Sequence, residues 1–132
     1  MTFVISDVPG MPSNLKASDI TKNSVLLEWS KPRYDGGSKI TSYIIERCDT
    51  SRNIWTHAGS VEGNKFCFSV PNLREGSEYH FSVAAENDMG VGDACKTDMP
   101  IKVKGQFGRG QGHLLHMCFH IGVNVIVAKK HD

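Results

Sequence analysis

The chain has 132 residues, of which 39% are hydrophobic and 22% are charged, and its formal net charge is +1. These values are typical of one ordinary globular domain with some length to spare. The near balance of 15 basic and 14 acidic residues excludes the one-sided charge that binding to nucleic acid or to an anionic membrane requires. We therefore expect no nucleic-acid partner and no membrane partner.

The cysteine pattern and the first residues indicate the compartment. Residues 1–10 lack a secretory signal pattern, and no apolar run reaches the roughly 18 residues that a membrane span needs. The cysteines have neither a C-x-x-C pair nor zinc-site spacing; they are Cys48, Cys67, Cys95 and Cys118. Free thiols fit a reducing compartment better than a secreted scaffold. We therefore expect four reduced thiols in a cytoplasmic protein.

Short segments rich in β-branched and aromatic residues alternate with turns rich in Gly, Pro, Asn and Asp. This pattern is typical of an all-β domain. Residues 9–12 contain two prolines and are expected to form a stiff linker that leads into the domain. In chain order, strands are expected at 15–20, 24–30, 40–48, 54–60, 65–70, 77–86 and 91–97, the last continuing into 100–104.

The alternation within these strands predicts which side chains form a core. In the second strand Val25, Leu27 and Trp29 share one face. Seven alternating strands favour two packed sheets, because one open sheet would leave its apolar face in water. The expected core consists of Trp29, Tyr43, Ile45, Phe68, Val70, Leu73, Tyr79, Phe81 and Val83.

Several turn motifs, in a fixed order, resemble the fibronectin type III family. They are Asp-Gly-Gly-Ser at 35–38, Leu-x-Glu-Gly-x-x-Tyr at 73–79 and Ala-Glu-Asn-x-x-Gly-x-Gly at 85–92. The resemblance covers residues 9–104 and implies a seven-stranded immunoglobulin-like β-sandwich. Residues 1–8 are expected to be an extension, and residues 105–132 a tail outside the fold.

The turn motifs are most similar to those of domains from giant sarcomeric proteins such as titin, twitchin and myosin-binding protein C. This resemblance implies a structural and protein-binding module that spaces and scaffolds components along the thick filament, in the A-band of the sarcomere. The implied partners are myosin filament components and neighbouring tandem domains. Tyr79 is expected to bond backbone near Leu73 as a tyrosine corner, and Gly76 and Gly90 to occupy turn conformations that side chains resist.

Outward-facing residues of the third, fourth, sixth and seventh strands form the candidate partner surface. They are Ile44, Glu46, His57, His80, Ser82 and Glu86. No histidine or carboxylate belongs to a recognisable catalytic constellation, so we expect no enzyme activity, cofactor or small-molecule substrate. An adhesion receptor at the cell surface stays open as an alternative, although the turn at 87–90 lacks the Arg-Gly-Asp motif.

The tail carries two further patterns. His113, His116, Cys118 and His120 have the side chains of a zinc site, but their local spacing suits a tetrahedron poorly, and we expect chance clustering and no metal. Apolar residues alternate from Met117 to Val127. We expect this stretch to be poorly ordered; the alternative is a strand that adds to a sheet edge, here or in a partner.

Overall fold

The computed structural model describes residues 6–105, 115–116 and 127–128. Every regular element among these residues is a strand, as expected, and no helix among them is long and apolar enough to cross a membrane. The strands are β1 Ser13–Ser18, β2 Val25–Ser30, β3 Ser42–Asp49, β4 Ile54–Glu62, β5 Cys67–Val70, β6 Glu78–Asn87, β7 Gly90–Val91, β8 Cys95–Lys96, β9 Ile101–Lys102, β10 Leu115–His116 and β11 Val127–Ala128.

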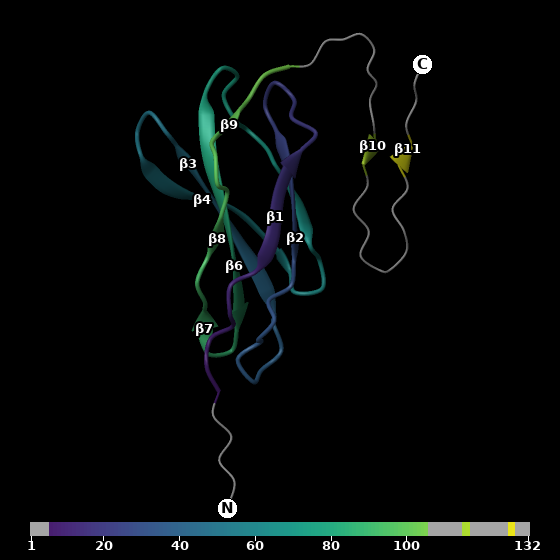
Figure 1. Ribbon diagram of the computed structural model, residues 1–132, viewed down its shortest axis with the longest axis vertical. Helices are drawn as coiled ribbons and strands as arrows, with labels where there is room; N and C mark the ends of the chain where they lie inside the picture. Colours follow the sequence, from purple (N-terminus) through teal and green to yellow (C-terminus); the bar gives the residue numbers. More distant parts are fainter. Residues whose placement is uncertain (1–5, 106–114, 117–126, 129–132) are drawn as a thin grey trace, which may run out of the picture.

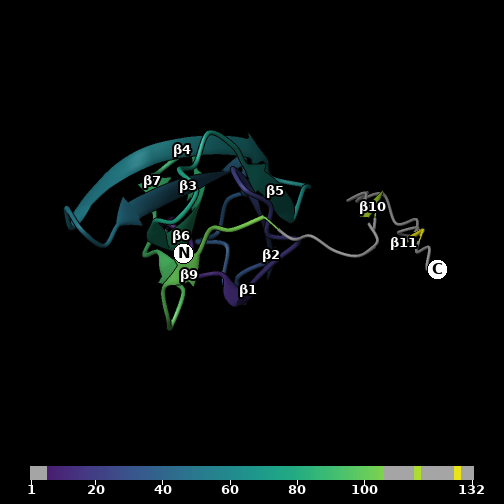
Figure 2. The same ribbon diagram turned by 90° about the horizontal axis from the view of Figure 1, so that it is seen from above.

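Two antiparallel sheets form the sandwich. One has the strand order β1-β2-β5; the other has the order β4-β3-β6, with β7, β8 and β9 all pairing with β6. Figure 2 shows the layer containing β3 and β4 lying over the layer containing β1 and β2. Counted as one interrupted strand, β7 to β9 complete the predicted seven (Figure 1). Pro100 has no N–H to donate to a ladder, which accounts for a break before β9.

The core lies between the sheets, where the sequence alternation predicts it. Every predicted core residue except Phe68 is at most 5% exposed. Phe68 is half-buried and packs against this cluster, its ring lying against Gly59, where a side chain would collide with it. Val103 is fully buried too and extends the core toward the end of the domain.

The predicted tyrosine corner is present. The hydroxyl oxygen of Tyr79 accepts a hydrogen bond from the backbone N–H of Arg74 at 3.0 Å, one residue beyond Leu73. The Arg47 guanidinium lies 5.8 Å from the centroid of the Tyr79 ring and donates to the carbonyl oxygen of Asn72 at 3.3 Å. Gly76, in the turn that these contacts hold, has a φ of 92°, which favours glycine over any residue with a side chain.

A bulge in β4 controls which of its side chains face the core. His57 pairs with Glu46, whereas Gly59 pairs with the preceding residue Ile45, so Ala58 is the extra residue. Because a bulge reverses the alternation beyond it, β4 turns His57 outward and Val61 toward the core.

The cysteines depart from the expectation of four reduced thiols. Cys48 and Cys95 are free, but Cys67 is disulfide-bonded. Cys67 lies on β5, an edge strand of the three-stranded sheet, where it can be reached from outside the sandwich. Cysteine spacing alone carries no information on such pairing.

The predicted tail lies mostly outside the described residues. Its described part is a two-stranded antiparallel pair, with Leu115 opposite Ala128 and His116 opposite Val127. The expectation of a poorly ordered tail, and its alternative of a strand added to a sheet edge, concern mainly residues outside the described part and stay predictions. The candidate metal cluster also falls outside, apart from the backbone of His116, and no group of three metal-ligating side chains occurs in the part of the chain that the structure describes.

Burial of the Tyr43 phenol leads to a testable prediction about the stability of the domain at high pH. Burial raises the pKa of Tyr43 from 10.0 to about 12. As the pH rises between these values, the unfolded chain releases a proton that the folded chain keeps, so stability present below pH 10 is lost. Over this range, the free energy of unfolding of Tyr43→Phe is expected to fall by roughly 2–3 kcal/mol less than that of the wild type. Urea titration of both proteins below pH 10 and near pH 12 measures the difference. Equal losses in both proteins would contradict the assignment.

Candidate interaction surface

The candidate partner residues lie on one face of the sheet formed by β4, β3, β6 and β8. The pairing register places Ile44 opposite Ala84, Glu46 opposite both His57 and Ser82, and Ser82 opposite Lys96. Because side chains directly opposite each other point to the same side of a sheet, these residues form rows across its outer face. The structure therefore brings the six candidates together.

Their accessibility is uneven, and one candidate must be corrected. His57 is exposed, and Ile44, Glu46, His80 and Glu86 are half-buried. Ser82 is only 3% exposed, so it cannot offer the contact surface that its outward register predicted. It lies in the central strand between two longer side chains, Glu46 and Lys96.

Hydrogen bonds hold two of the candidates against the sheet. The Ser42 hydroxyl donates to the Glu86 carboxylate at 2.7 Å, and His80 Nδ1 lies 3.3 Å from the Thr97 hydroxyl oxygen. A surface whose side chains are already oriented loses less conformational entropy when it binds. This arrangement suits recognition of another protein.

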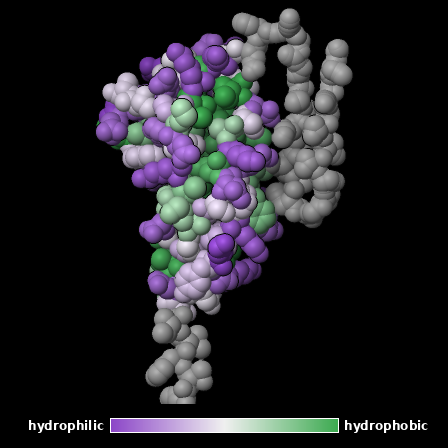
Figure 3. Space-filling model, viewed as in Figure 1, coloured by the Kyte–Doolittle hydropathy of each residue, from purple (hydrophilic) through white to green (hydrophobic). Residues whose placement is uncertain are grey.

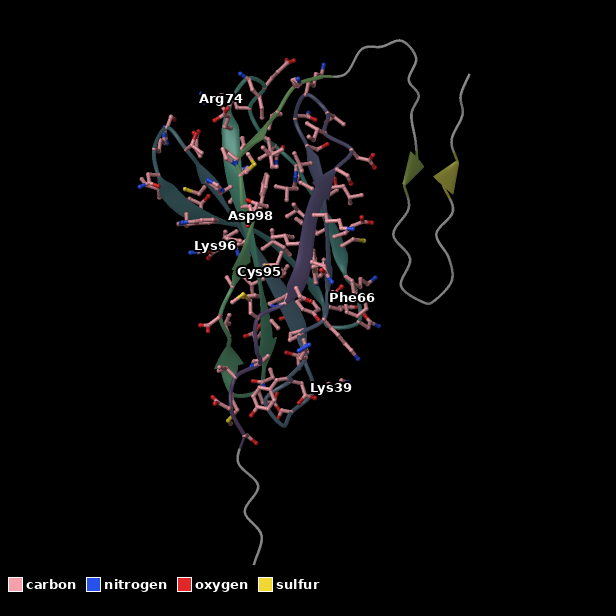
Figure 4. The ribbon with its side chains drawn as sticks, viewed as in Figure 1. Lys39, Phe66, Arg74, Cys95, Lys96 and Asp98 are labelled. Carbon is pink, nitrogen blue, oxygen red and sulfur yellow. The ribbon has the colours of Figure 1, made fainter. Side chains whose placement is uncertain are left out.

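The sequence did not predict the contact between Lys96 and Trp55, which lies across this face. Lys96 on β8 places its ammonium 5.3 Å from the ring centroid of Trp55 on β4, so a cation–π contact joins the two sides of the sheet. Figure 4 shows Lys96 on β8, next to Cys95. The only signal that the sequence offered was the type of residue at Trp55, in the expected strand 54–60, because the contact joins segments about 40 residues apart.

A second feature is the end of the sandwich where the chain enters. Here the segment 7–10 is clamped between the loop 34–37 and the turn 87–92. Asn87 is 3% exposed, and its side-chain amide donates to the carbonyl oxygens of Asp7 at 2.7 Å and Asp35 at 2.9 Å. Its side-chain oxygen accepts from the Met89 N–H at 2.8 Å. One side chain thus ties three segments together.

Backbone contacts and glycines complete the clamp. The N–H of Asp7 donates to the carbonyl oxygen of Gly36, and the N–H of Gly10 donates to that of Tyr34, both at 2.8 Å. A side chain at Gly36 would collide with the Asp7 carbonyl, and one at Gly92 with the Pro9 carbonyl. Among the described residues, the contacts of this clamp begin at Asp7, two residues before the start of the predicted domain.

Exposed apolar side chains gather around this clamp. We call the segment 7–11, the loop 34–37 and the turn 87–92 the N-terminal pole. Of the six large hydrophobic residues that are exposed in the described part of the chain, four belong to it: Met11, Tyr34, Met89 and Val91. In the view of Figure 3, hydrophobic and hydrophilic residues are interspersed over the whole visible side of the molecule.

The opposite end carries the outgoing chain. Val103 exchanges backbone hydrogen bonds with Gly76 at 2.8 Å and Ser77 at 3.0 Å, and the Gly105 N–H donates to the Glu75 carboxylate at 3.4 Å. We call Lys22, the turn 72–76 and residues 103–105 the C-terminal pole. In Figure 1 the two poles lie at opposite ends of the long axis.

Comparison with known proteins agrees with this architecture. A family model described as "Fibronectin type III domain" matches residues 10–97. Titin of Drosophila melanogaster is 38% identical over 90 residues, which cover 68% of this chain and, as a rounded share, 0% of that protein. The cardiac-type myosin-binding protein C of Gallus gallus is 33% identical over 97 residues, 74% of this chain and 8% of that protein.

Solved structures give the same result. The crystal structure of domains A168-A170 from titin superimposes with a TM-score of 0.70 at 38% identity, covering 75% of this chain and 33% of that one. The chain spans at most 8% of the length of these two relatives and of three further curated relatives that it matches. The similarity therefore concerns one module of much longer proteins.

Proposed function

The chain belongs to the fibronectin type III family, and on this premise we propose that it is a non-catalytic spacer and protein-binding module of a giant muscle protein. In this role the module holds its neighbours at a set distance along the thick filament and presents a rigid face to a filament protein. Its partners are myosin filament components and neighbouring tandem domains, and it acts in the cytoplasm, in the A-band of the sarcomere.

One observation carries the spacer role: a single strand connects both attachment points. The last residue of β6, Asn87, holds the incoming segment at Asp7. The first residue of β6, Glu78, pairs with Lys102 of the outgoing segment. Ten residues of extended strand at roughly 3.3 Å each span about 30 Å. The distance between the incoming and outgoing chain is therefore determined by the central strand of the larger sheet.

The relatives support the muscle assignment. Two of them are titin and a myosin-binding protein C, and the second name states that the protein binds myosin. The outer face of β4-β3-β6-β8, with its preoriented mixed polar side chains, supplies the binding surface. A single face of this size buries about 800 Å² per partner at most, so one module binds weakly and repeated modules provide the strength.

Localisation in muscle cells tests this function. The full chain carrying a fluorescent tag is expected to show faint A-band striping, and several linked copies clear striping. In the linked copies, combining His57→Glu with Lys96→Glu on the outer face should abolish the stripes. The matched control, Lys16→Glu with Ser69→Glu, alters exposed residues of the other sheet and should leave them intact.

Two outcomes would overturn the proposal. Linked copies that stay diffuse would exclude filament binding, and equal loss of striping in the control would exclude the outer face as the binding surface. Transport of the full-length parent protein to the cell surface would favour the adhesion-receptor alternative.

A further inference from the structure

The three-stranded sheet carries a leucine that is buried without belonging to the core. Leu26 is 8% exposed, although alternation along β2 places it on the side of the sheet away from the core cluster. The residues directly opposite it are Ser18 on β1 and Ser69 on β5, and a serine side chain is much shorter than a leucine side chain. Lys16, on a diagonal from Leu26, is itself exposed. The adjacent strands therefore do not account for this burial, and another segment must lie over Leu26.

A disulfide bond indicates which segment this is. Cys67 lies on the same side of the sheet, diagonally across from Leu26 at about 7–8 Å, and it is disulfide-bonded. Cys48 and Cys95 are free, and the chain has only four cysteines. Cys118, in the tail, is therefore the one partner that this chain itself offers to Cys67.

The outgoing chain leaves the sandwich within reach of this site. Gly105 lies beside Lys22 in the connection between β1 and β2, since a Cβ on Gly105 would be 3.5 Å from that of Lys22. This connection is at the Val70 end of β5, and Cys67 is three residues along that strand, roughly 10 Å away. The thirteen residues from 106 to Cys118 span up to about 43 Å when extended. Figures 1 and 2 both show β10 and β11 beside the part of the domain that contains β2 and β5.

We propose that the tail of this chain, residues 106–132, docks on the outer side of the β1-β2-β5 sheet, and that a disulfide between Cys67 and Cys118 holds it there as a redox-sensitive staple. The tail supplies apolar side chains for such a site, with six of them alternating from Met117 to Val127. The docked tail covers Leu26. When the bond is reduced, a single pair of strands buries too little apolar area to stay docked, and Leu26 becomes exposed.

Formation of the staple is a thiol–disulfide exchange. The Cys67 thiolate attacks a sulfur of a small-molecule disulfide such as oxidised glutathione, which releases one small thiol and leaves a mixed disulfide. The Cys118 thiolate then attacks the sulfur of Cys67 and releases the second small thiol. Two protein thiols are oxidised, the small disulfide is reduced, and the two protons leave on the small thiols. A reducing compartment drives the exchange in reverse, so the staple forms when the surroundings become oxidising.

Peptide mapping of the full chain tests the pairing. The chain is oxidised with glutathione disulfide, and its remaining thiols are alkylated in denaturant. Mass spectrometry is expected to find two peptides linked through Cys67 and Cys118, with Cys48 and Cys95 alkylated. The Cys118→Ser variant should lose this link, and the matched control Cys95→Ser should keep it. An alkylated Cys67, or a bond from Cys67 to anything other than Cys118 of the same chain, would overturn the inference.

The exposure of Leu26 tests the docking. A soluble gadolinium chelate broadens the methyl signals of side chains that face the solvent. The Leu26 methyl signals are expected to broaden several-fold more after reduction of the full chain, and as strongly in oxidised Cys118→Ser. Oxidised Cys95→Ser should keep Leu26 protected, and the Ile44 methyl signals, from the outer face of the other sheet, should not respond to reduction. Equal broadening of Leu26 in the oxidised and reduced chains would overturn the inference.

These results are separate from the outcome of the localisation experiment. Striping depends on the outer face that contains His57 and Lys96, whereas the staple is measured at Cys67 and Leu26 in the purified chain. Linked copies that stay diffuse would overturn the proposed function and leave the staple standing. Clear striping by a chain that forms no bond between Cys67 and Cys118 would overturn the staple alone.

Discussion

Replacing Trp29 with alanine is expected to lower the free energy of unfolding by about 3–5 kcal/mol, the range for a large buried aromatic side chain. Trp29 is 5% exposed and belongs to the central core cluster. Its ring centroid lies 5.3 Å from that of Tyr43, whose ring in turn packs edge-on against Phe66. Truncation therefore leaves a cavity between the two sheets. Urea titration measures the loss as a shift in midpoint with an unchanged slope.

A milder change at the same position separates packing from hydrogen bonding. The indole Nε1 of Trp29 is buried and has no hydrogen-bond partner among the described residues. Trp29→Phe removes this unsatisfied donor while keeping an aromatic ring, so its cost should be well below that of alanine. If both variants lose the same stability, the side chain stabilises the domain through an interaction other than packing.

Asn87→Ala is expected to lower the free energy of unfolding by about 2–4 kcal/mol. The change removes two donors and one acceptor and leaves the carbonyl oxygens of Asp7 and Asp35 without this partner. Each buried polar group left unsatisfied costs about 1–3 kcal/mol. Hydrogen exchange should report the effect locally: the Asp7 and Gly10 amides, which bond to the loop at 34–37, should lose protection more than the β3 amides.

The neighbouring residue provides the control for this experiment. Asp88 is exposed and lies in the same turn, so Asp88→Ala should change the stability by less than about 0.5 kcal/mol, as surface substitutions usually do. An Asn87→Ala variant that is equally stable, or one in which exchange at Asp7 and Gly10 is unchanged, would show that the clamp does not depend on this side chain.

Local patterns in the sequence were sufficient for most of the fold. Strict alternation in β2 and β6 identified the buried faces, because neighbouring side chains of a strand point to opposite sides. Val25, Leu27, Phe81 and Val83 are all fully buried as this rule requires. The turn residues preceding Tyr79 likewise identified the tyrosine corner, since that contact joins residues only five apart in the chain.

Alternation was insufficient at the candidate surface, where neighbouring strands decide exposure. Ser82 and Ala84 have outward register, yet they are 3% and 6% exposed because β6 is flanked on both sides. The cation–π contact between Lys96 and Trp55 connects β8 with β4, which lie on opposite sides of the central strands. The sequence specifies the residue type at each of these positions. Whether side chains on the adjacent strands cover that residue depends on how the strands pair.

The sequence by itself determined the fold class, the family, the core and the positions of most strands, because these depend on residue type and on short-range periodicity. Tertiary structure alone decided the bulge at Ala58, the division of the last strand into β7, β8 and β9, and the clamp at Asn87. The bulge and the divided strand depend on the register of pairing with a neighbouring strand, whereas the clamp requires segments far apart in the chain to meet. The bond from Asn87 to Asp7 joins residues 80 apart, and no local pattern specifies which of many polar side chains will close such a distance.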